Sequence, residues 1–553
     1  MRRAAGLAGL LLALSATAAG AASTVPPATA PTTASTATTA TDPNALVRPT
    51  DLDATPLLHK LRPRQVLAIA IRVPKIAEML PRHKGYTVEA YEKGVSRWQV
   101  SYFDPGLPRK EIGQVLVEDS TGKVVEAWTG FQVAWSMARG YPGAFGRVVN
   151  SPWIWVPLSI LFALPFVNPR RWRQWLHLDL LVLSGFSVSL AFFNHGEIGL
   201  SVPIVAPLLV YLLIRMLAIA LRRNAPPPEV RLLVPVTWLA IAMVFLIGFR
   251  VGLNVANSNV IDVGYAGVIG ADRLAHGEKL YGHFPKDNDH GDTYGPVVYE
   301  TYVPFELAEP WHGTWDDLPA AHGAAVFFDL LCVLLLFLIG RRVRGPDLGI
   351  VLAYAWTAYP FTIYATSSNS NDALVAALIL LALLVAGRPV ARGAVAALAG
   401  LSKFAPLALA PVLATHGLEP GRRVRGLVRF GLGFAVTAFV VSLPVLLQED
   451  LSTFYDRTIG FQAGRGSPFS PWGLYDWDLA QSIVQGLGVA LAVGLAFLPR
   501  RRDLPGLAAA CAAVLIGLQL GVTHWFYLYI PWFFGLVMIA VLGRAPLQPW
   551  RRA

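Results

Sequence analysis

The sequence predicts an all-α polytopic membrane protein with a small α+β domain near its N-terminus. Of its 553 residues, 54% are apolar and only 15% are charged, whereas a soluble protein carries about 25% charged residues. Long apolar runs follow residue 150 and basic residues cluster between them, while the stretch before residue 150 is polar and mixed. This pattern excludes a single water-soluble enzyme and a disordered or fibrous chain. The net charge of +11 then reports membrane topology and not a nucleic-acid patch.

The first residues are typical of a signal peptide. Arg2 and Arg3 precede an apolar stretch that ends in the small residues Ala19-Gly20-Ala21. Because this stretch is long, an uncleaved anchor is the alternative for residues 1–22. Residues 23–50 are mostly Ala, Thr and Pro, a composition that cannot bury a core and predicts a linker.

Residues 51–150 are expected to form the small α+β domain, outside the cytoplasm. Helical spacing over 63–80 is followed by strand-like alternation, with turn residues between the segments 98–103, 113–118 and 123–128. Helix followed by an antiparallel meander predicts an α+β fold. The stretch from Val117 to Gly130, with Thr121-Gly122 and Trp128-Thr129-Gly130, resembles a PepSY-type domain.

The remaining chain contains about eleven apolar runs that approach or exceed the length needed to cross a bilayer core of ~30 Å. They are expected at 153–167, 176–194, 199–221, 232–249, 320–340, 348–365, 373–387, 427–447, 479–498, 504–522 and 526–542. With alternating spans, the arginine clusters between Arg170 and Arg552 all fall on one side, which the positive-inside rule makes cytoplasmic. The chain should therefore reside in the cytoplasmic (inner) membrane, with the N-terminal domain outside.

One apolar stretch, residues 391–415, does not fit this alternation. Arg388 and Arg392 at its start and Arg422 after it are expected on the same side, and Lys403 and Pro406 interrupt its middle. A re-entrant pair of half-helices satisfies both flanks. We expect Lys403 to snorkel toward the cytoplasm, and we leave it out of the predicted site.

Two polar loops are expected on the outer side of the membrane, over residues 250–319 and 448–478. Polar loops above a hydrophobic body favour a site at the outer membrane interface. An acidic cluster in the first loop could bind a divalent cation, but its spacing matches no EF-hand or zinc motif, and a solvated loop is the favoured interpretation for Asp287, Asp289, His290 and Asp292. Cys332 and Cys511 lie in apolar runs, which leaves no thiolate metal site.

A series of short motifs runs through residues 232–553. They are NSNVIDVGYAGVIGADRLAHGEKLYG, Tyr294-Gly295-Pro296, NSNDALVAALILLALLVAGRPVARGAVAALAGLSKFAPLALAP, GRGSPFSPWGL and Thr523-His524-Trp525-Phe526-Tyr527. This order resembles the GT-C superfamily of integral-membrane glycosyltransferases, most closely the bacterial polyprenyl-phosphate-mannose-dependent mannosyltransferases. The helices of residues 151–231 and the N-terminal domain are additions to that pattern, and Tyr-Gly-Pro replaces the more usual Tyr-Pro-Pro.

The resemblance implies roles for individual residues. Asp262 occupies the place of the family's catalytic carboxylate, where it would take the acceptor's proton; a helix N-cap is the alternative. Arg465 would bind the donor phosphate through its planar fork, unless it only contacts lipid headgroups. Ser467 and His524 would assist it, and contacts to substrate are expected from Tyr265, Asp292, Tyr294, Asn371 and Trp472, with helix capping as the alternative for Asn371.

We therefore expect a hexosyltransferase that moves a sugar, with mannose as first choice, from a polyprenyl-phosphate carrier to a glycan or glycolipid acceptor. No cofactor and no nucleic acid are expected, and a divalent cation is left open. A multi-pass transporter is one alternative, and it predicts acids buried within spans, for which Asp179 and Asp329 are candidates, with Asp372 at the margin of a span. A non-catalytic envelope protein with a partner-binding N-terminal domain is the other, although about eleven spans exceed what an anchor needs.

Overall fold

The computed structural model describes residues 46–140, 145–171, 173–222, 230–418, 420–498, 501, 503–544 and 547–549. The chain divides into two compact units. Among the described residues, the smaller unit contains those up to residue 140 together with 193–198, and the larger unit contains the rest. The predicted signal peptide or anchor and most of the predicted linker lie outside the described residues.

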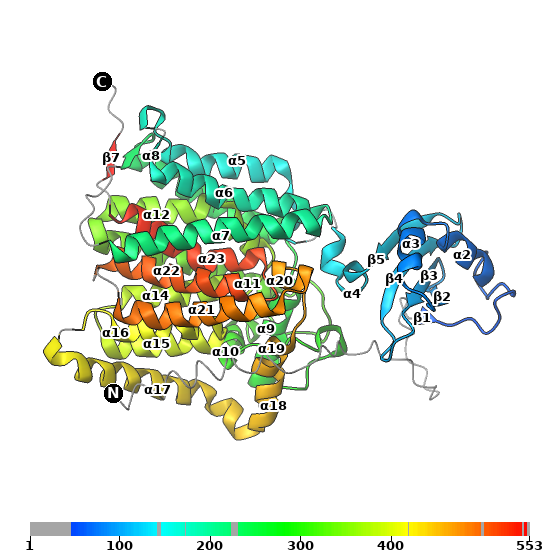
Figure 1. Cartoon of the computed structure of the whole chain (residues 1–553). Coiled ribbons are helices and arrows are strands. Elements are labelled where there is room, and N and C mark those ends of the chain that lie inside the picture. The colour runs from blue at the N-terminus through cyan, green and yellow to red at the C-terminus, as the bar shows by residue number, and fades with distance from the viewer. Residues whose placement is uncertain are drawn as a thin grey trace. The chain divides into compact units, whose positions relative to one another are not determined.

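The smaller unit is an antiparallel meander with two helices (Figure 1). Its described strands follow chain order across the sheet: β1 (Leu46–Val47), β2 (Thr87–Lys93), β3 (Arg97–Phe103), β4 (Glu111–Glu118) and β5 (Val124–Thr129). The helices are α2 (Pro63–Ala70) and α3 (Pro74–Met79), and a short helix α4 (Phe131–Ala134) follows the sheet. The predicted helix and the three predicted strands are confirmed. The prediction missed β2 and also β1, which lies within the predicted linker. It ran α2 and α3 together, whereas Pro74 starts a new helix there.

Apolar side chains of the two helices and the sheet form the core of this unit. Trp98 at its centre is fully buried, and its indole Nε1 donates to Asp119 at 2.8 Å. Asp119 also accepts the backbone N–H groups of Lys60 and Leu61, at 2.7 and 3.0 Å. One carboxylate therefore joins the loop before α2 to the sheet.

The larger unit consists of helices whose axes are roughly aligned (Figure 1). Its helices are α5 (Pro152–Ala163), α6 (Trp175–Asn194), α7 (Ile198–Leu221), α8 (Val236–Ala256), α9 (Asp262–Ala275), α10 (Pro296–Glu306), α11 (Pro319–Arg344), α12 (Pro346–Ala358), α13 (Pro360–Ser367), α14 (Asp372–Leu384), α15 (Pro389–Ser402), α16 (Ala410–Thr415), α17 (Arg423–Gln448), α18 (Leu451–Tyr455), α19 (Phe461–Gly464), α20 (Pro471–Tyr475), α21 (Asp478–Phe497), α22 (Leu504–Gly521) and α23 (Ile530–Leu542). Two short strands, β6 (Val230–Leu232) and β7 (Leu547–Pro549), pair in parallel. Many of these helices begin at a proline, which lacks the N–H that the first turn would leave unpaired.

The expected count of about eleven spans is not confirmed. Each expected run coincides with a helix or a bent pair of helices, but within the described residues only seven helices are long and apolar enough to cross a membrane, or eight with the bent pair. The runs expected at 153–167, 373–387 and 526–542 form shorter apolar helices. The chain is therefore a membrane protein with several spans.

Two interruptions shape the middle of the larger unit. Helices α12 and α13 meet at a bend of 59°, because Pro360 cannot continue a helix and holds Tyr359 in an extended conformation. The second interruption is the predicted break at Lys403, which is extended and ends α15. A short 3-10 helix (Ala405–Leu409) and α16 follow it.

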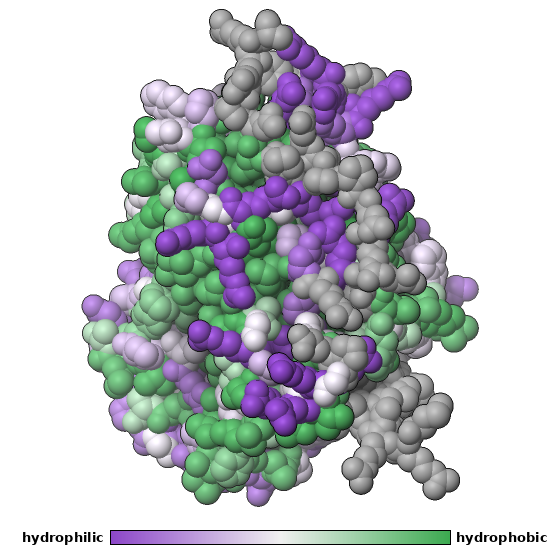
Figure 2. Space-filling view, turned by 90° about the vertical axis from the view of Figure 1, so that its left-hand side faces the viewer, coloured by the Kyte–Doolittle hydropathy of each residue, from purple (hydrophilic) through white to green (hydrophobic). Residues whose placement is uncertain are grey.

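The helices of the larger unit have two distinct ends. Arg342 donates to the carbonyl of Leu384, where α14 ends, and Arg344 donates at 3.0 Å to that of Gly543, after α23. We call this the arginine end. Asp372 begins α14 at the opposite end, which we call the aspartate end. Figure 2 views the left-hand side of Figure 1 and shows hydrophilic residues gathered on a surface with hydrophobic flanks.

Candidate functional site

The candidate site lies at the aspartate end, where Asp262 begins α9. The chain before Asp262 is bonded to the end of α13, since Asn259 and Ile261 donate their N–H groups to the carbonyls of Ser367 and Ser368 at 3.1 and 3.2 Å. Gly264 then packs so closely on this turn that an added Cβ would lie 2.1 Å from the Asn369 carbonyl oxygen. A glycine is thus required for the first turn of α9 to dock here.

Asp262 is exposed to solvent, yet many protein atoms surround its carboxyl group. Burial raises the pKa of its carboxyl above the ordinary value, although the Val263 N–H and the positive charges of Arg465 and Lys403 oppose that rise. Asp262 is the first residue of α9, and the N-cap position belongs to Ile261. The N-cap alternative for Asp262 is therefore wrong, and its carboxylate is available for other contacts.

Lys403 is the site residue that the sequence interpretation missed. It does not extend toward the arginine end, because its Nζ lies 2.6 Å from the Oδ1 atom of Asp372, at the start of α14. Trp532 donates its indole N–H to the same oxygen at 3.0 Å. The ammonium also lies 5.2 Å from the ring centroid of Tyr294. The break in α15 thus delivers a cation to the neighbourhood of Asp262.

The predicted Tyr294 comes from a segment that docks against the end of α15. Gly295 donates its N–H to the Ser402 carbonyl at 3.1 Å, and an added Cβ at Gly295 would lie 1.9 Å from the Leu401 carbonyl oxygen. Burial raises the pKa of Tyr294 well above its ordinary value, and the negative charge of Asp262 adds to the rise. The tyrosine stays protonated and faces both Lys403 and Asp262.

The three predicted phosphate-binding residues converge at the same end. Ser467 Oγ lies 3.0 Å from His524 Nδ1. Burial, with the charge of Arg465 adding to it, holds the pKa of His524 well below its ordinary value, so the imidazole is neutral at pH 7. Arg465 is near enough to influence Asp262, Tyr294 and His524. One arginine and one lysine therefore lie near enough to the Asp262 carboxyl to lower its pKa.

Asn371 presents unsatisfied polar atoms at this end. Its side chain is fully buried, and neither its Oδ1 nor its Nδ2 has a hydrogen-bond partner among the described residues. It occupies the N-cap position of α14 without making a side-chain cap bond, so the capping alternative is not what the structure shows. Buried amides without partners are rare in proteins, and a bound ligand is one way to satisfy them.

The remaining predicted residues make supporting contacts. Tyr265 stacks on Trp315, with ring centroids 4.9 Å apart. Asp292 is buried and accepts from Arg457 Nε at 2.7 Å, which joins its loop to the segment after α18. Trp472 donates to the Leu520 carbonyl at 2.7 Å. Among the residues that the structure describes, no group of three or more His, Cys, Asp or Glu side chains is arranged to hold a metal ion.

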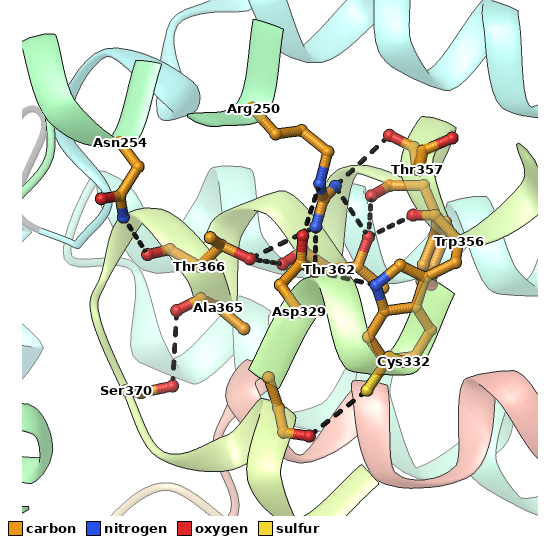
Figure 3. A network of polar contacts seen from close by, with 12 residues as sticks. Arg250, Asn254, Asp329, Cys332, Trp356, Thr357, Thr362, Ala365, Thr366 and Ser370 are labelled. Atoms are coloured by element: carbon orange, nitrogen blue, oxygen red, sulfur yellow. Dashed lines mark hydrogen bonds and ion pairs between the residues drawn. The ribbon is translucent and has the colours of Figure 1, made fainter. Parts of the chain in front are cut away.

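A buried polar network lies behind the 369–372 turn (Figure 3). Arg250 Nε donates to Asp329 Oδ2 at 2.9 Å, and its Nη2 contacts Asp329 Oδ1 and, at 3.2 Å, Thr366 Oγ1. Trp356 donates to the same carboxylate at 2.8 Å. Helices α8, α11, α12 and α13 meet in this network. Arg250 therefore lies within helix α8 and its side chain is buried, so the first polar loop begins after Ala256 and not at 250 as expected.

The network reaches the candidate site through Asn254, one turn further along α8. Its Nδ2 donates at 2.7 Å to both the Thr366 carbonyl and Asn369 Oδ1. Asn369 has a positive φ of 48°, a conformation that Asn tolerates better than most residues. The buried charges of α8 and α11 thus position the turn that carries Asn371 and Asp372.

The two acids that a transporter would need are already paired. Asp329 binds Arg250, and Asp179 accepts from Arg215 Nε and from the Tyr211 hydroxyl, at 2.9 and 2.8 Å. Acids neutralised by fixed partners are poor candidates for a proton or ion pathway. This pairing weighs against the transporter alternative.

Removal of the Arg465 charge is expected to change the pH dependence of any reaction in which Asp262 acts as a base. A base works above its pKa, so activity falls as the pH drops through the raised pKa of Asp262. Since Arg465 opposes that rise, Arg465→Gln should move the acid limb of the kcat/KM profile to higher pH. An unshifted acid limb, measured over the same pH range as the unmodified chain, would contradict this electrostatic link.

Residues 293–528 match the model of glycosyltransferase family 87, a membrane family of the GT-C type. The match indicates a membrane glycosyltransferase. It includes Tyr294, Lys403, Arg465 and His524, whereas Asp262 lies before it. A search of curated proteins finds no match.

Proposed function

We propose that this protein transfers a hexose, with mannose as the first candidate, from a polyprenyl-phosphate carrier to an acceptor hydroxyl on the outer side of the cytoplasmic membrane. The observation that carries the proposal is the exposed Asp262, whose carboxylate is influenced by the positive charges of Arg465 and Lys403. A carboxylate beside two fixed cations suits a reaction in which a proton is taken up while a phosphate departs.

The proposed step forms one bond and breaks another at the anomeric carbon. The acceptor oxygen attacks this carbon while its proton passes to the Asp262 carboxylate. The bond from the anomeric carbon to the phosphate oxygen breaks, and polyprenyl phosphate leaves with the electron pair. Arg465 stabilises the departing phosphate, with Ser467 and His524 beside it. Tyr294 and the amide of Asn371 are available as hydrogen-bonding groups for the sugar.

In this proposal Lys403 both binds Asp372 and supplies positive charge to the site. Its ammonium already binds Asp372, so it supplies positive charge near the reacting atoms without being free to act as an acid. The second oxygen of Asp372 has no partner among the described residues. An acceptor or sugar hydroxyl could donate to it.

A direct assay tests the proposal. Membranes that contain the full chain should consume polyprenyl-phospho-mannose and release polyprenyl phosphate, while membranes that contain the Asp262→Asn variant should not. Polyprenyl-phospho-glucose serves as the comparison donor. If neither donor is consumed in the presence of a mixed glycan and glycolipid extract, the proposed donor class is wrong.

Exchange of Arg465 for lysine is expected to lower kcat clearly, and exchange for alanine to lower it by about 10²–10³-fold, as for the loss of a transition-state donor. Lysine keeps the charge but loses the planar fork that matches two phosphate oxygens. Steady-state kinetics on the purified variants measure this, with Arg273→Lys in the last turn of α9 as the matched control. Normal turnover in both Arg465 variants would leave Arg465 as a lipid-facing loop residue.

The proposed orientation places the Asp262 loop and the smaller unit in the same compartment. Lys286 and Lys123 are both exposed, and the native Cys332 and Cys511 are buried. Cysteines introduced at Lys286 and Lys123 should therefore both react with a membrane-impermeant thiol reagent in intact cells. Labelling of only one of them would overturn the proposed topology.

A further inference from the structure

The arginine end holds a cavity that the proposed function does not use. Its volume is about 690 Å³. The ends of α11 and α14 and the starts of α15 and α22 contribute to its wall, which includes Arg342, Arg344, Arg392, His416, Leu418 and Asp503. Asp372 and Leu384 mark opposite ends of α14, so this arginine-end cavity is separate from the Asp262 site.

The cavity is strongly positive. Its three arginines bind backbone carbonyls: Arg342 that of Leu384, Arg344 that of Gly543, and Arg392 that of Ala386. Within the described part of the chain, none of the three pairs with a carboxylate. Asp503 is the one acid on the described wall, and it is engaged by Arg501 and by the Gly506 N–H at 2.9 Å. A backbone carbonyl accepts a hydrogen bond from the guanidinium group but carries no net charge, so the positive charge of the arginine is not compensated.

Arg392 carries the strongest indication of a ligand. Only 2% of its surface is exposed, yet its Nε and Nη2 atoms have no hydrogen-bond partner among the described residues. These two N–H groups share one edge of the guanidinium, the edge that binds two oxygens of one anion. A buried, unpartnered charged edge is costly. Arg392 lines the cavity, so an anion that enters the cavity could approach this guanidinium, which also lies 6.0 Å from the Phe430 ring centroid.

The surroundings favour a phosphate group. Three guanidinium groups without carboxylate partners supply more N–H donors than the two oxygens of a carboxylate accept, and a phosphate group presents more oxygens. The N-terminal end of α15, which favours anions, meets the cavity at Pro389.

The cavity also borders a surface suited to lipid. Leu418 on the wall packs on α17, where an added Cβ at Gly426 would lie 2.3 Å from its side chain. The neighbouring Val424 and Val428 of α17 are exposed. Acyl chains could follow this apolar face while a headgroup enters the cavity.

We infer that the arginine-end cavity binds the phosphate group of an anionic ligand through Arg392, with Arg342 and Arg344 as supporting cations. The phosphate could belong to the headgroup of an anionic phospholipid or to a soluble compound, and the chemistry of recognition is the same. The inference does not depend on the proposed transferase activity.

The experiment uses the full chain in nanodiscs. In the first arm, inorganic phosphate is titrated into discs of phosphatidylcholine, with chloride at equal ionic strength as the reference. In the second arm, phosphatidylglycerol replaces part of the phosphatidylcholine. We expect the thermal unfolding temperature to rise in at least one arm. A rise only with phosphatidylglycerol identifies the headgroup, and a rise only with phosphate identifies a soluble ligand.

Variants decide whether the cavity causes the rise. Arg392→Gln should weaken the apparent affinity about tenfold, the loss of one bidentate contact, and Arg342→Gln should weaken it less. Arg342 is exposed, so this second variant keeps the test valid if Arg392→Gln does not fold. The control is Arg425→Gln, an exposed arginine near the start of α17 that does not line the cavity. No rise in either arm, or equal losses in the cavity and control variants, would overturn the inference.

Discussion

Replacement of Asp262 by Asn is expected to lower kcat by about 10²–10⁴-fold, which is roughly 3–5 kcal/mol of transition-state stabilisation. Asparagine keeps the size of the side chain but cannot accept the acceptor's proton. Donor binding should change little, because the phosphate is assigned to Arg465 and not to Asp262, so the loss belongs in kcat and not in KM. Sugar transfer by the purified variant measures the effect.

Stability measurements separate this role from a structural one. Asp262 is the first residue of α9 and not its N-cap, so loss of its charge should cost only about 0.3–1 kcal/mol of helix-dipole stabilisation. Asp272→Asn, a carboxylate exchange on the same helix, is the matched control and should retain activity. A fully active Asp262→Asn variant would remove the proposed mechanism and reopen the transporter alternative.

Loss of either partner of the Arg250–Asp329 pair is expected to destabilise the protein by about 3–5 kcal/mol. Both side chains are almost completely buried, so Asp329→Leu leaves a guanidinium without a counter-charge in an apolar surrounding. Arg250→Met leaves the carboxylate with only the Trp356 N–H and neighbouring groups. The free energy of unfolding in mixed micelles measures both effects.

The double variant Arg250→Met/Asp329→Leu should recover most of the lost stability, since the cost arises from an uncompensated buried charge and not from the absence of the pair. Additive losses in the double variant would contradict this. Activity should recover less, because Thr366 then loses its Arg250 contact and the turn that carries Asn371 and Asp372 is less firmly held.

Several features of this chain were predictable because they depend on local sequence. Helix after helix coincides with the expected apolar runs, and β3, β4 and β5 coincide with the expected alternation. The span count was less predictable, since a helix such as α14 is apolar but short. Length alone cannot tell a crossing helix from one that ends inside the protein. The PepSY-type resemblance and the preference for mannose stay predictions.

The candidate site was predictable only in part. Arg465, Ser467 and His524 were assigned to one function from a family resemblance, and the structure brings them together. Asp292 and Trp472 make structural contacts, and their contacts to substrate stay predictions. Lys403 was missed, although a charge inside an apolar segment is itself a functional signal. The direction of the Lys403 side chain depends on the break in α15, and the residue that it meets there cannot be predicted from the sequence.

The sequence by itself determined where the chain is apolar, where helices start at prolines, and that polar residues gather in the segments around 262, 294 and 465. Only the tertiary structure decided that Lys403 meets Asp372, that Arg250 meets Asp329, and that Arg392 is left with an open edge at the opposite end. The physical reason is the range of the interactions. Hydrophobic periodicity and backbone preferences act between near neighbours in the chain, whereas a buried charge is neutralised by whichever helix packs beside it, and that choice belongs to the fold as a whole.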